Sequence, residues 1–251
     1  MENKVYLFNT KNYFTFVSAS DKKAPCVVIL PGGGYDHTSN LESFNVAKRF
    51  TDRGIHACVI NYREEIISYP EPQKELAYTI DYLRKVELVI PDKIICIGFS
   101  AGGHLALSNA CFYKELGYNS RPNYLVLCYP VISSKEGISH KGSFNNLLMG
   151  LNDGTLYQKM SLEDNLPEDL PPVFLWHTVT DKSVPVENSL KLMEALSAKH
   201  LNYEAHLFPQ GCHGMSLADS TTAVNDSRKA DPYVARWTDM MFVWLEHIMK
   251  K

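Results

Sequence analysis

The chain lacks the segments by which proteins commonly cross membranes or bind nucleic acids. No apolar run approaches the ~18 uninterrupted residues of a membrane-spanning helix, and the first residues carry no apolar signal-peptide core. There is no basic stripe or lysine-rich tail, and the formal net charge is −3, whereas a nucleic-acid-binding domain carries a basic footprint. We therefore expect a soluble, cytoplasmic protein with neither a nucleic-acid partner nor a membrane partner.

Motifs for metal and nucleotide binding are also missing. The six cysteines include no C-x-x-C pair, the spacing typical of structural zinc sites. Four of them lie in or beside apolar segments, where a thiol packs as a small apolar side chain; these are Cys26, Cys58, Cys96 and Cys128. No glycine-rich stretch follows the dinucleotide-binding or P-loop pattern. The sequence thus predicts six reduced thiols, no metal site and no organic cofactor.

The chain does contain a regular alternation of short apolar segments and segments with helical periodicity. Strands are predicted at residues 4–8, 13–17, 26–30, 57–61, 94–97, 124–128, 173–177 and 204–208. Helices are predicted at residues 40–53, 72–88, 103–115, 186–199 and 233–249. Such alternation indicates an α/β fold, with helices on both faces of a mostly parallel sheet of about eight strands. A chain of 251 residues can form this fold as a single domain, residues 1–251.

One stretch, residues 131–171, interrupts this rhythm. It is longer than a normal connection and rich in glycine and proline, which is typical of a lid or an insertion that borders a site. A purely structural excursion is the alternative. A short apolar helix is predicted at 147–149. Candidates for an acyl or sugar pocket, unless they simply pack, are Leu147, Leu148, Met149 and Tyr157.

Residues 98–102 read Gly-Phe-Ser-Ala-Gly and lie between an apolar strand and a helix. In this setting G-x-S-x-G forms a sharp turn that presents the serine hydroxyl at the head of the helix. Glycine at both ends of the motif removes side chains that would collide with the neighbouring strand and helix. Ser100 is therefore the candidate nucleophile, and an ordinary glycine-rich turn is the alternative interpretation.

A serine nucleophile needs a base, and the base needs an orienting partner. Among nine histidines, His213 lies in a glycine-bracketed loop beyond the last predicted strand, where it can reach the C-terminal edge of the sheet. Asp181 follows the preceding predicted strand and is the candidate acid, although it could instead cap the next helix. We expect His104 to pack or cap locally and His177 to hydrogen-bond within its loop. The chain order Ser100, Asp181, His213 is that of α/β-hydrolases.

A second glycine cluster predicts an oxyanion hole. Gly32, Gly33 and Gly34 follow the strand predicted at 26–30 and can turn backbone N–H groups inward with no side chain in the way. Together with the N–H of Ala101, the N–H groups of Gly33 and Gly34 would stabilise the negative charge that develops during acyl transfer. A phosphate-binding loop is the alternative, but the spacing fits neither of its common patterns.

These motifs resemble those of the α/β-hydrolase superfamily. The similarity extends over residues 24–249 and includes Pro-Gly-Gly-Gly-Tyr at 31–35, Asn-Tyr-Arg at 61–63 and Gly-Phe-Ser-Ala-Gly-Gly-His at 98–104. Within the superfamily the chain looks most like small carbohydrate esterases, the acetyl-xylan-esterase-like branch related to hormone-sensitive-lipase-like esterases. Pro31 stands where the lipase group usually has histidine, which argues against the lipase branch proper.

The resemblance implies a serine hydrolase of the α/β-hydrolase fold, with Ser100 as nucleophile, His213 as base and Asp181 as orienting acid. It also implies the oxyanion donors, namely Gly33, Gly34 and Ala101. Arg63 matches the family's Tyr-Arg pattern, in either a structural or a substrate-facing role.

The expected substrate is a small-molecule ester with a short acyl group, such as an acetylated sugar or a similar alcohol. Three alternatives remain: an amidase such as a formamidase, a small peptidase, and a non-catalytic ligand-binding protein on the same fold. The sequence leaves the oligomeric state open, a homodimer included.

Overall fold

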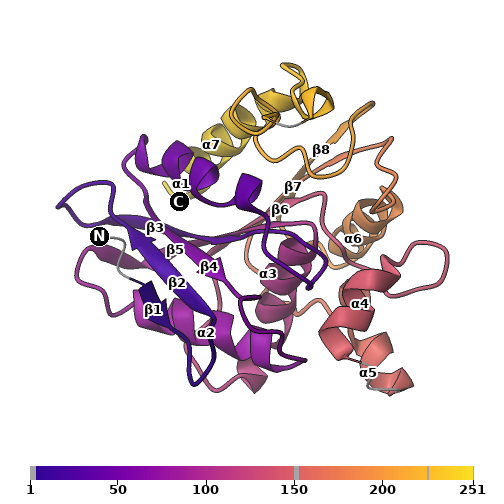
Figure 1. Cartoon of the computed structure of the whole chain (residues 1–251), viewed down its shortest axis with the longest axis horizontal. Helices are drawn as coiled ribbons and strands as arrows, with labels where there is room; N and C mark the ends of the chain where they lie inside the picture. Colours follow the sequence, from indigo (N-terminus) through magenta and orange to yellow (C-terminus); the bar gives the residue numbers. More distant parts are fainter. Residues whose placement is uncertain (1–3, 150–152, 225, 251) are drawn as a thin grey trace.

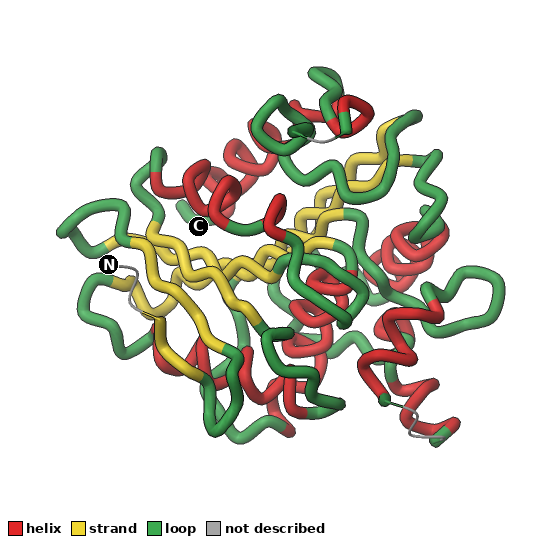
Figure 2. The backbone as a smooth tube through the Cα atoms, in the orientation of Figure 1, coloured by secondary structure: helices red, strands yellow, loops and turns green. Residues whose placement is uncertain are grey.

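An eight-stranded sheet runs through the middle of the molecule, with helices on both sides (Figure 1 and Figure 2). The structure is a computed structural model that describes residues 4–149, 153–224 and 226–250. The strands are β1 (Lys4–Tyr6), β2 (Tyr13–Val17), β3 (Ala24–Leu30), β4 (His56–Asn61), β5 (Val89–Phe99), β6 (Tyr124–Cys128), β7 (Val173–Thr178) and β8 (Tyr203–Phe208). Their order is β1-β2-β4-β3-β5-β6-β7-β8, antiparallel at β1–β2 and β2–β4 and parallel from β4 onward. The predicted fold class is confirmed.

Helices cover both faces of this sheet (Figure 1). One face carries α1 (Phe44–Thr51) and α7 (Trp237–Ile248), and the other carries α2 (Glu71–Leu83), α3 (Ala101–Phe112) and α6 (Glu187–Ala198). Next to α3 and α6 lie α4 (Lys141–Leu148) and α5 (Gly154–Lys159), and 3-10 turns form at Asn40–Glu42, Tyr113–Glu115, Leu162–Asp164, Ser227–Lys229 and Val234–Arg236. Within the described ranges, no helix is both long and apolar enough to cross a membrane. The cytoplasmic location stays a prediction.

Side chains along each central strand alternate between two hydrophobic cores. In β3, Cys26, Val28 and Leu30 belong to the core beneath α2 and α3, whereas Val27 and Ile29 belong to the core beneath α1 and α7. The alternation follows from the two-residue repeat of a strand, and because helices cover both faces, the strand is apolar at successive positions. Burying each such side chain stabilises the fold by roughly 1.5–3 kcal/mol. The central strands thus form a rigid base for the loops at their carboxyl ends.

Several predicted boundaries differ from the structure. The helix predicted at 72–88 ends at Leu83, and the helix predicted at 233–249 begins at Trp237. β5 begins at Val89, ahead of the predicted 94–97, because Val89 pairs with Ala24 across an irregularity in the ladder. The helix predicted at 40–53 is divided at Ser43, whose φ of −107° and ψ of −107° lie outside the helical region. The strand β5 thus extends beyond the apolar run 94–97. At Ser43, the backbone angles divide a helix through which the apolar pattern continues.

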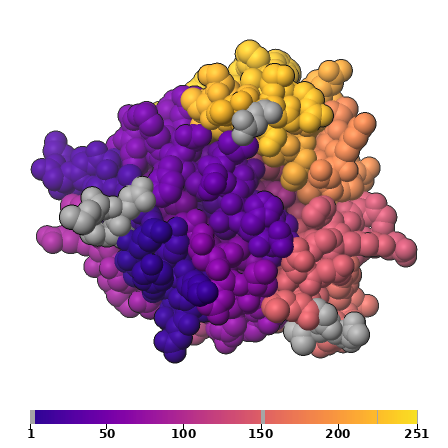
Figure 3. Space-filling model, viewed as in Figure 1, coloured from indigo at the N-terminus to yellow at the C-terminus, as the bar shows by residue number. Residues whose placement is uncertain are grey.

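The described residues of the segment 131–171 pack onto the rest of the chain. Three side chains of α4 are buried in the same core as α3, namely Phe144, Leu147 and Leu148. In the space-filling view the segment forms a flank that is continuous with the neighbouring surface (Figure 3). The short helix predicted at 147–149 falls at the end of α4, and residues 150–152 lie outside the described part of the chain.

His104 joins this segment to α3 and to the loop after β3. Its Nε2–H donates to the Met160 carbonyl over 3.1 Å, and its Nδ1 accepts from the Tyr35 hydroxyl over 3.0 Å. Burial lowers the pKa of His104 to about 4, and the hydrogen bond to Met160 offsets only part of that effect. The ring is therefore neutral at pH 7, and it packs locally as predicted.

We expect the folded protein to lose stability through His104 as pH falls from about 6.5 to about 4. In this window the unfolded chain binds a proton at the imidazole that the folded protein rejects, so the free energy of unfolding decreases with falling pH. The shift from 6.5 to about 4 corresponds to on the order of 3 kcal/mol.

The test is His104→Gln, whose amide can donate to Met160 and accept from Tyr35 but cannot be protonated. Urea titrations at pH 7 and pH 4 should show that this variant loses about 2–3 kcal/mol less free energy of unfolding than the wild type. Equal losses in both proteins would contradict the assignment.

Candidate active site

Ser100 lies in a strained turn between β5 and α3. Its φ is 52° and its ψ is −118°, a region that side chains rarely occupy. A Cβ on Gly98 would lie 2.2 Å from the Gly102 carbonyl oxygen, and a Cβ on Gly102 would lie 2.0 Å from the Leu30 carbonyl oxygen. Both glycines are therefore required by close backbone contacts, as predicted. The turn places the Ser100 hydroxyl at the carboxyl end of the sheet.

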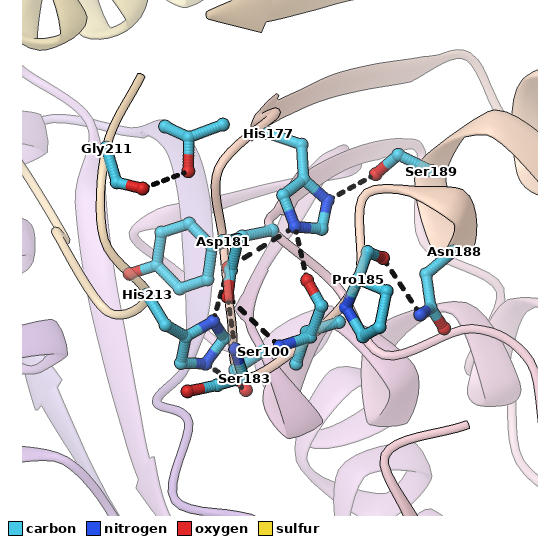
Figure 4. A network of polar contacts seen from close by, with 12 residues as sticks. Ser100, His177, Asp181, Ser183, Pro185, Asn188, Ser189, Gly211 and His213 are labelled. Carbon is cyan, nitrogen blue, oxygen red and sulfur yellow. Dashed lines mark hydrogen bonds and ion pairs between the residues drawn. The ribbon is translucent and has the colours of Figure 1, made fainter. Parts of the chain in front are cut away.

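The structure brings Ser100, His213 and Asp181 into a hydrogen-bonded chain (Figure 4). His213 Nε2 lies 2.9 Å from Ser100 Oγ, and His213 Nδ1 lies 2.6 Å from Asp181 Oδ2. His213 is on the loop after β8, and Asp181 is on the loop after β7. An imidazole held in this way can accept a proton from the serine hydroxyl while the carboxylate fixes its tautomer and stabilises its cation.

Asp181 is buried and surrounded by donors. Its Oδ1 accepts from the backbone N–H groups of Ser183 and Val184, at 2.8 and 3.0 Å. Burial alone would raise the pKa of Asp181, but hydrogen bonds from His177 and His213 outweigh it and hold that pKa well below its usual range. Asp181 is thus an anion throughout the neutral pH range.

His177 supports the acid. Its Nε2 lies 3.1 Å from the Val184 carbonyl oxygen and 3.3 Å from Asp181 Oδ2, and its Nδ1 lies 2.7 Å from Ser189 Oγ (Figure 4). The prediction that His177 hydrogen-bonds within its loop is confirmed. Its contact with Asp181 was not predicted, although the four-residue spacing between the two is visible in the sequence.

The glycine loop after β3 lies directly beside Ser100. A Cβ on Gly32 would lie 3.0 Å from the Cβ of Ser100, and the φ angles of Gly33 and Gly34 are 129° and 63°, which favour glycine. Among the residues that the structure describes, the N–H groups of Gly33 and Gly34 donate to no acceptor. Ala101 is the first residue of α3, so its N–H has no partner within the helix. The three predicted donors are therefore available to a ligand.

A buried polar network connects the loops of the site, and no pattern in the sequence indicates it. Glu42 accepts from the Gly32 N–H over 2.7 Å and from the Tyr129 hydroxyl over 2.6 Å. The same hydroxyl accepts from the Ser216 N–H over 2.9 Å, and the Tyr129 ring packs edge-on against His213 at 5.1 Å. Glu42 and Tyr129 thus couple the glycine loop to the loop that carries the histidine.

A cavity of about 710 Å³ opens beside His213. Its walls carry mainly polar and charged side chains, among them Lys182, Ser183, Gln210, Arg228, Lys229 and Asp231. By contrast, Leu147 and Leu148, which were predicted as pocket candidates, are core residues, and Tyr157 borders a different cavity with Ser134.

Arg63 has a structural setting. It is buried, donates to the Ile67 carbonyl over 2.7 Å, and lies 5.8 Å from the centre of the Tyr35 ring. All six cysteines are free thiols, as predicted. In the described part of the chain, no group of three or more His, Cys, Asp or Glu side chains is placed to hold a metal ion.

Comparisons with known proteins agree with this fold and site. The profile of the prolyl oligopeptidase family matches residues 71–241, and the BD-FAE profile matches residues 15–125. An acetylxylan esterase from Xylanibacter ruminicola is 31% identical over 228 residues, which cover 83% of this chain and 47% of that protein. The chain spans less than half the length of the curated relatives that it matches.

Solved structures match over nearly the whole chain. The acetyl ester-xyloside bifunctional hydrolase from Caldicellulosiruptor lactoaceticus is 33% identical with a TM-score of 0.85, covering 98% of this chain and 96% of that one. The carboxylesterase Cest-2923 from Lactobacillus plantarum is 26% identical with a TM-score of 0.85 and the same coverage. The chain therefore belongs to the α/β-hydrolase superfamily, and within it to the prolyl oligopeptidase family and the branch related to acetylxylan esterases.

Proposed function

We propose that the chain is a carboxylesterase that hydrolyses short acyl esters through an acyl-enzyme on Ser100. The observation that carries this proposal is the continuous chain from Ser100 Oγ to His213 Nε2, at 2.9 Å, and from His213 Nδ1 to Asp181 Oδ2, at 2.6 Å. Binding a ligand without reaction would not require a base beside the serine, so this geometry argues against a catalytically silent protein.

The reaction follows from the roles of these groups. His213 takes the proton of Ser100 as the hydroxyl oxygen attacks the ester carbonyl, and Asp181 stabilises the imidazolium that forms. His213 then gives the proton to the departing alcohol oxygen, which leaves an acyl group on Ser100. Water, deprotonated by His213, attacks this acyl-enzyme. As the second tetrahedral intermediate collapses, His213 returns the proton to Ser100 Oγ and the carboxylic acid leaves.

Backbone N–H groups stabilise the negative charge on the oxygen of each tetrahedral intermediate. In this proposal the N–H groups of Gly33, Gly34 and Ala101 form the oxyanion hole, because Ala101 follows Ser100 directly and Gly33 and Gly34 follow Gly32, which lies beside it. Each such donor typically contributes ~10²–10³ in rate. The pairing of Glu42 with the Gly32 N–H supports the conformation of the loop without consuming a donor of the hole.

An acetylated sugar or a similar alcohol is the substrate that we propose. The names of two relatives, an acetylxylan esterase and an acetyl ester-xyloside hydrolase, support this class. The polar lining of the cavity beside His213 also suits a hydroxylated alcohol better than a fatty chain. Helix α4 of the segment 131–171 would form a fixed wall of the site, because it is anchored in the core.

An amide-cleaving activity is the second candidate, because the matching profile is that of a peptidase family. The same serine mechanism cleaves amides when the site can protonate and release the amine. Relative rates on an acetyl ester, a formyl amide and a dipeptide amide distinguish the two candidates. A preference for either amide would replace the carboxylesterase proposal.

We expect activity on p-nitrophenyl esters to fall steeply beyond butyrate in a series from acetate to laurate. The names of two relatives, an acetylxylan esterase and an acetyl ester-xyloside hydrolase, point to a two-carbon acyl group, and each CH₂ beyond a small acyl site would stay in water instead of being buried. The series is measured as kcat/KM at constant ester solubility, with Ser100→Ala as the control for background hydrolysis. Highest activity on laurate would contradict the proposed acyl preference.

A further inference from the structure

A histidine that the proposed reaction does not use lies beside the glycine loop. His140 is the N-terminal cap of α4, in the segment 131–171. Its Cε1 lies 3.9 Å from the position that a Cβ on Gly34 would occupy. On the same helix, the Asn146 side-chain amide donates to the Gly34 carbonyl over 2.9 Å. Helix α4 is thereby fixed against the glycine loop, and it holds the His140 imidazole at the edge of the site.

The tautomer of His140 follows from its partners. The Ser143 backbone N–H is shared between the His140 carbonyl, at 3.0 Å, and His140 Nδ1, at 3.3 Å, and Ser143 Oγ lies 2.8 Å from Nδ1. Since a backbone N–H can only donate, Nδ1 is an acceptor and the neutral ring carries its hydrogen on Nε2. This Nε2–H donates to none of the residues that the structure describes, and the side chain is only half buried. An oriented donor is therefore available at the edge of the site.

The charges of His213 and Asp181 affect the pKa of His140. Burial lowers the pKa of His140, His213 lowers it further, and Asp181 acts in the opposite direction. The neutral ring is the favoured form, and a neutral ring does not repel the imidazolium that forms on His213 during reaction. Asn188 Nδ2 donates to the carbonyls of Ile138 and Pro185, at 2.8 and 3.0 Å. The residues just before His140 are therefore held beside the loop after β7, which carries Asp181.

We propose that His140 determines substrate specificity by donating its Nε2–H to an oxygen of the alcohol portion of the ester. This inference rests on the proposed esterase function. His213 must protonate the departing alcohol oxygen, so the alcohol lies between Ser100 and His213. His140 lies beside Gly34 and close enough to His213 for their charges to interact, and in this proposal its Nε2–H points toward that alcohol. It selects alcohols with a second oxygen near the ester, as in a partly acetylated sugar, over alcohols that lack one.

The test compares two acetyl esters, an O-acetylated methyl xyloside and p-nitrophenyl acetate. His140→Asn keeps a side chain that caps helices well but removes the ring donor. We expect kcat/KM for the sugar ester to fall about tenfold more than kcat/KM for p-nitrophenyl acetate, mainly through KM, as for the loss of one hydrogen bond. Ser143→Ala is the matched control: it leaves the ring and the backbone N–H that fixes its tautomer, so the ratio of the two rates should stay within about twofold.

The possible results distinguish a specificity role of His140 from an oxyanion role and from no role. Equal losses on both esters, seen in kcat, would make His140 an oxyanion donor and overturn the specificity role. An unchanged ratio in His140→Asn, or the same change in Ser143→Ala, would overturn it as well. If the wild type hydrolyses neither ester, the proposed function fails and this inference with it. Calorimetric binding of the sugar ester to Ser100→Ala, with and without His140→Asn, gives a readout that needs no turnover, and we expect Kd to rise about tenfold.

Discussion

Ser100→Gly is expected to lose about 10⁴- to 10⁶-fold in kcat and to be more stable than Ser100→Ala. Both variants remove the nucleophile, and losses of this size are typical when a serine of such a triad is deleted. Their stabilities should differ because the backbone of Ser100, at φ 52° and ψ −118°, is strained by any Cβ. Such strain is of the order of 1–3 kcal/mol, and glycine relieves it. At ordinary positions alanine is the more stabilising of the two residues, so the expected order is reversed.

The backbone contacts of residue 100 provide the control. Its N–H donates to the Cys128 carbonyl, and its carbonyl accepts from the N–H groups of Gly103 and Val131. Both variants retain these bonds, so the difference between them isolates the effect of the Cβ. Thermal unfolding should place Ser100→Gly a few degrees above Ser100→Ala, since about 1 kcal/mol shifts Tm by ~2–4 °C in a chain of this size. A lower Tm for the glycine variant would show that the turn is not strained.

Asp181→Asn should lower kcat by about 10⁴-fold. The backbone N–H groups of Ser183 and Val184 hold Oδ1 as an acceptor, so the amide of asparagine replaces Oδ2 opposite His213 Nδ1. An amide N–H at that position would turn Nδ1 into an acceptor and place the hydrogen on Nε2. His213 would then be unable to accept the proton of Ser100.

The matched control for Asp181→Asn is Asp164→Asn. Asp164 lies in the segment 131–171, is exposed, and pairs with Lys135 at 2.7 Å. Surface pairs of this kind contribute about 0–1 kcal/mol, so kcat should change less than twofold. Steady-state kinetics on p-nitrophenyl acetate measures both variants. A loss of less than tenfold in Asp181→Asn would remove Asp181 from the proposed mechanism.

The residues that sequence analysis identified are those whose function requires a local pattern. Ser100 sits in a glycine-flanked turn, and the structure gives the reason in the 2.2 and 2.0 Å approaches that a Cβ at Gly98 or Gly102 would make. Asp181 and His213 each follow a strand, and parallel strands deliver such loops to one edge of the sheet. Because the predicted strands were placed correctly, these three distant residues could be expected to meet.

Residues that act through distant contacts could not be found in this way. Glu42 and Tyr129 are 87 residues apart in the chain, and nothing in the pattern around either residue indicates the other. The sequence around His140 carries no motif, yet a helix cap in the segment 131–171 places this residue at Gly34. The pocket candidates Leu147 and Leu148 illustrate the same limit, since an apolar helix in an insertion can face either a site or the core.

The most direct test of the central claim is to trap the acyl-enzyme. The wild-type protein is mixed with an acetyl ester, quenched in acid during turnover, digested and analysed by peptide mass spectrometry. We predict one added acetyl group on the peptide that contains Ser100, absent from the same peptide of Ser100→Ala. Ester consumption without acetylated protein, or an acetyl group on another residue that forms at the rate of turnover, would contradict the account.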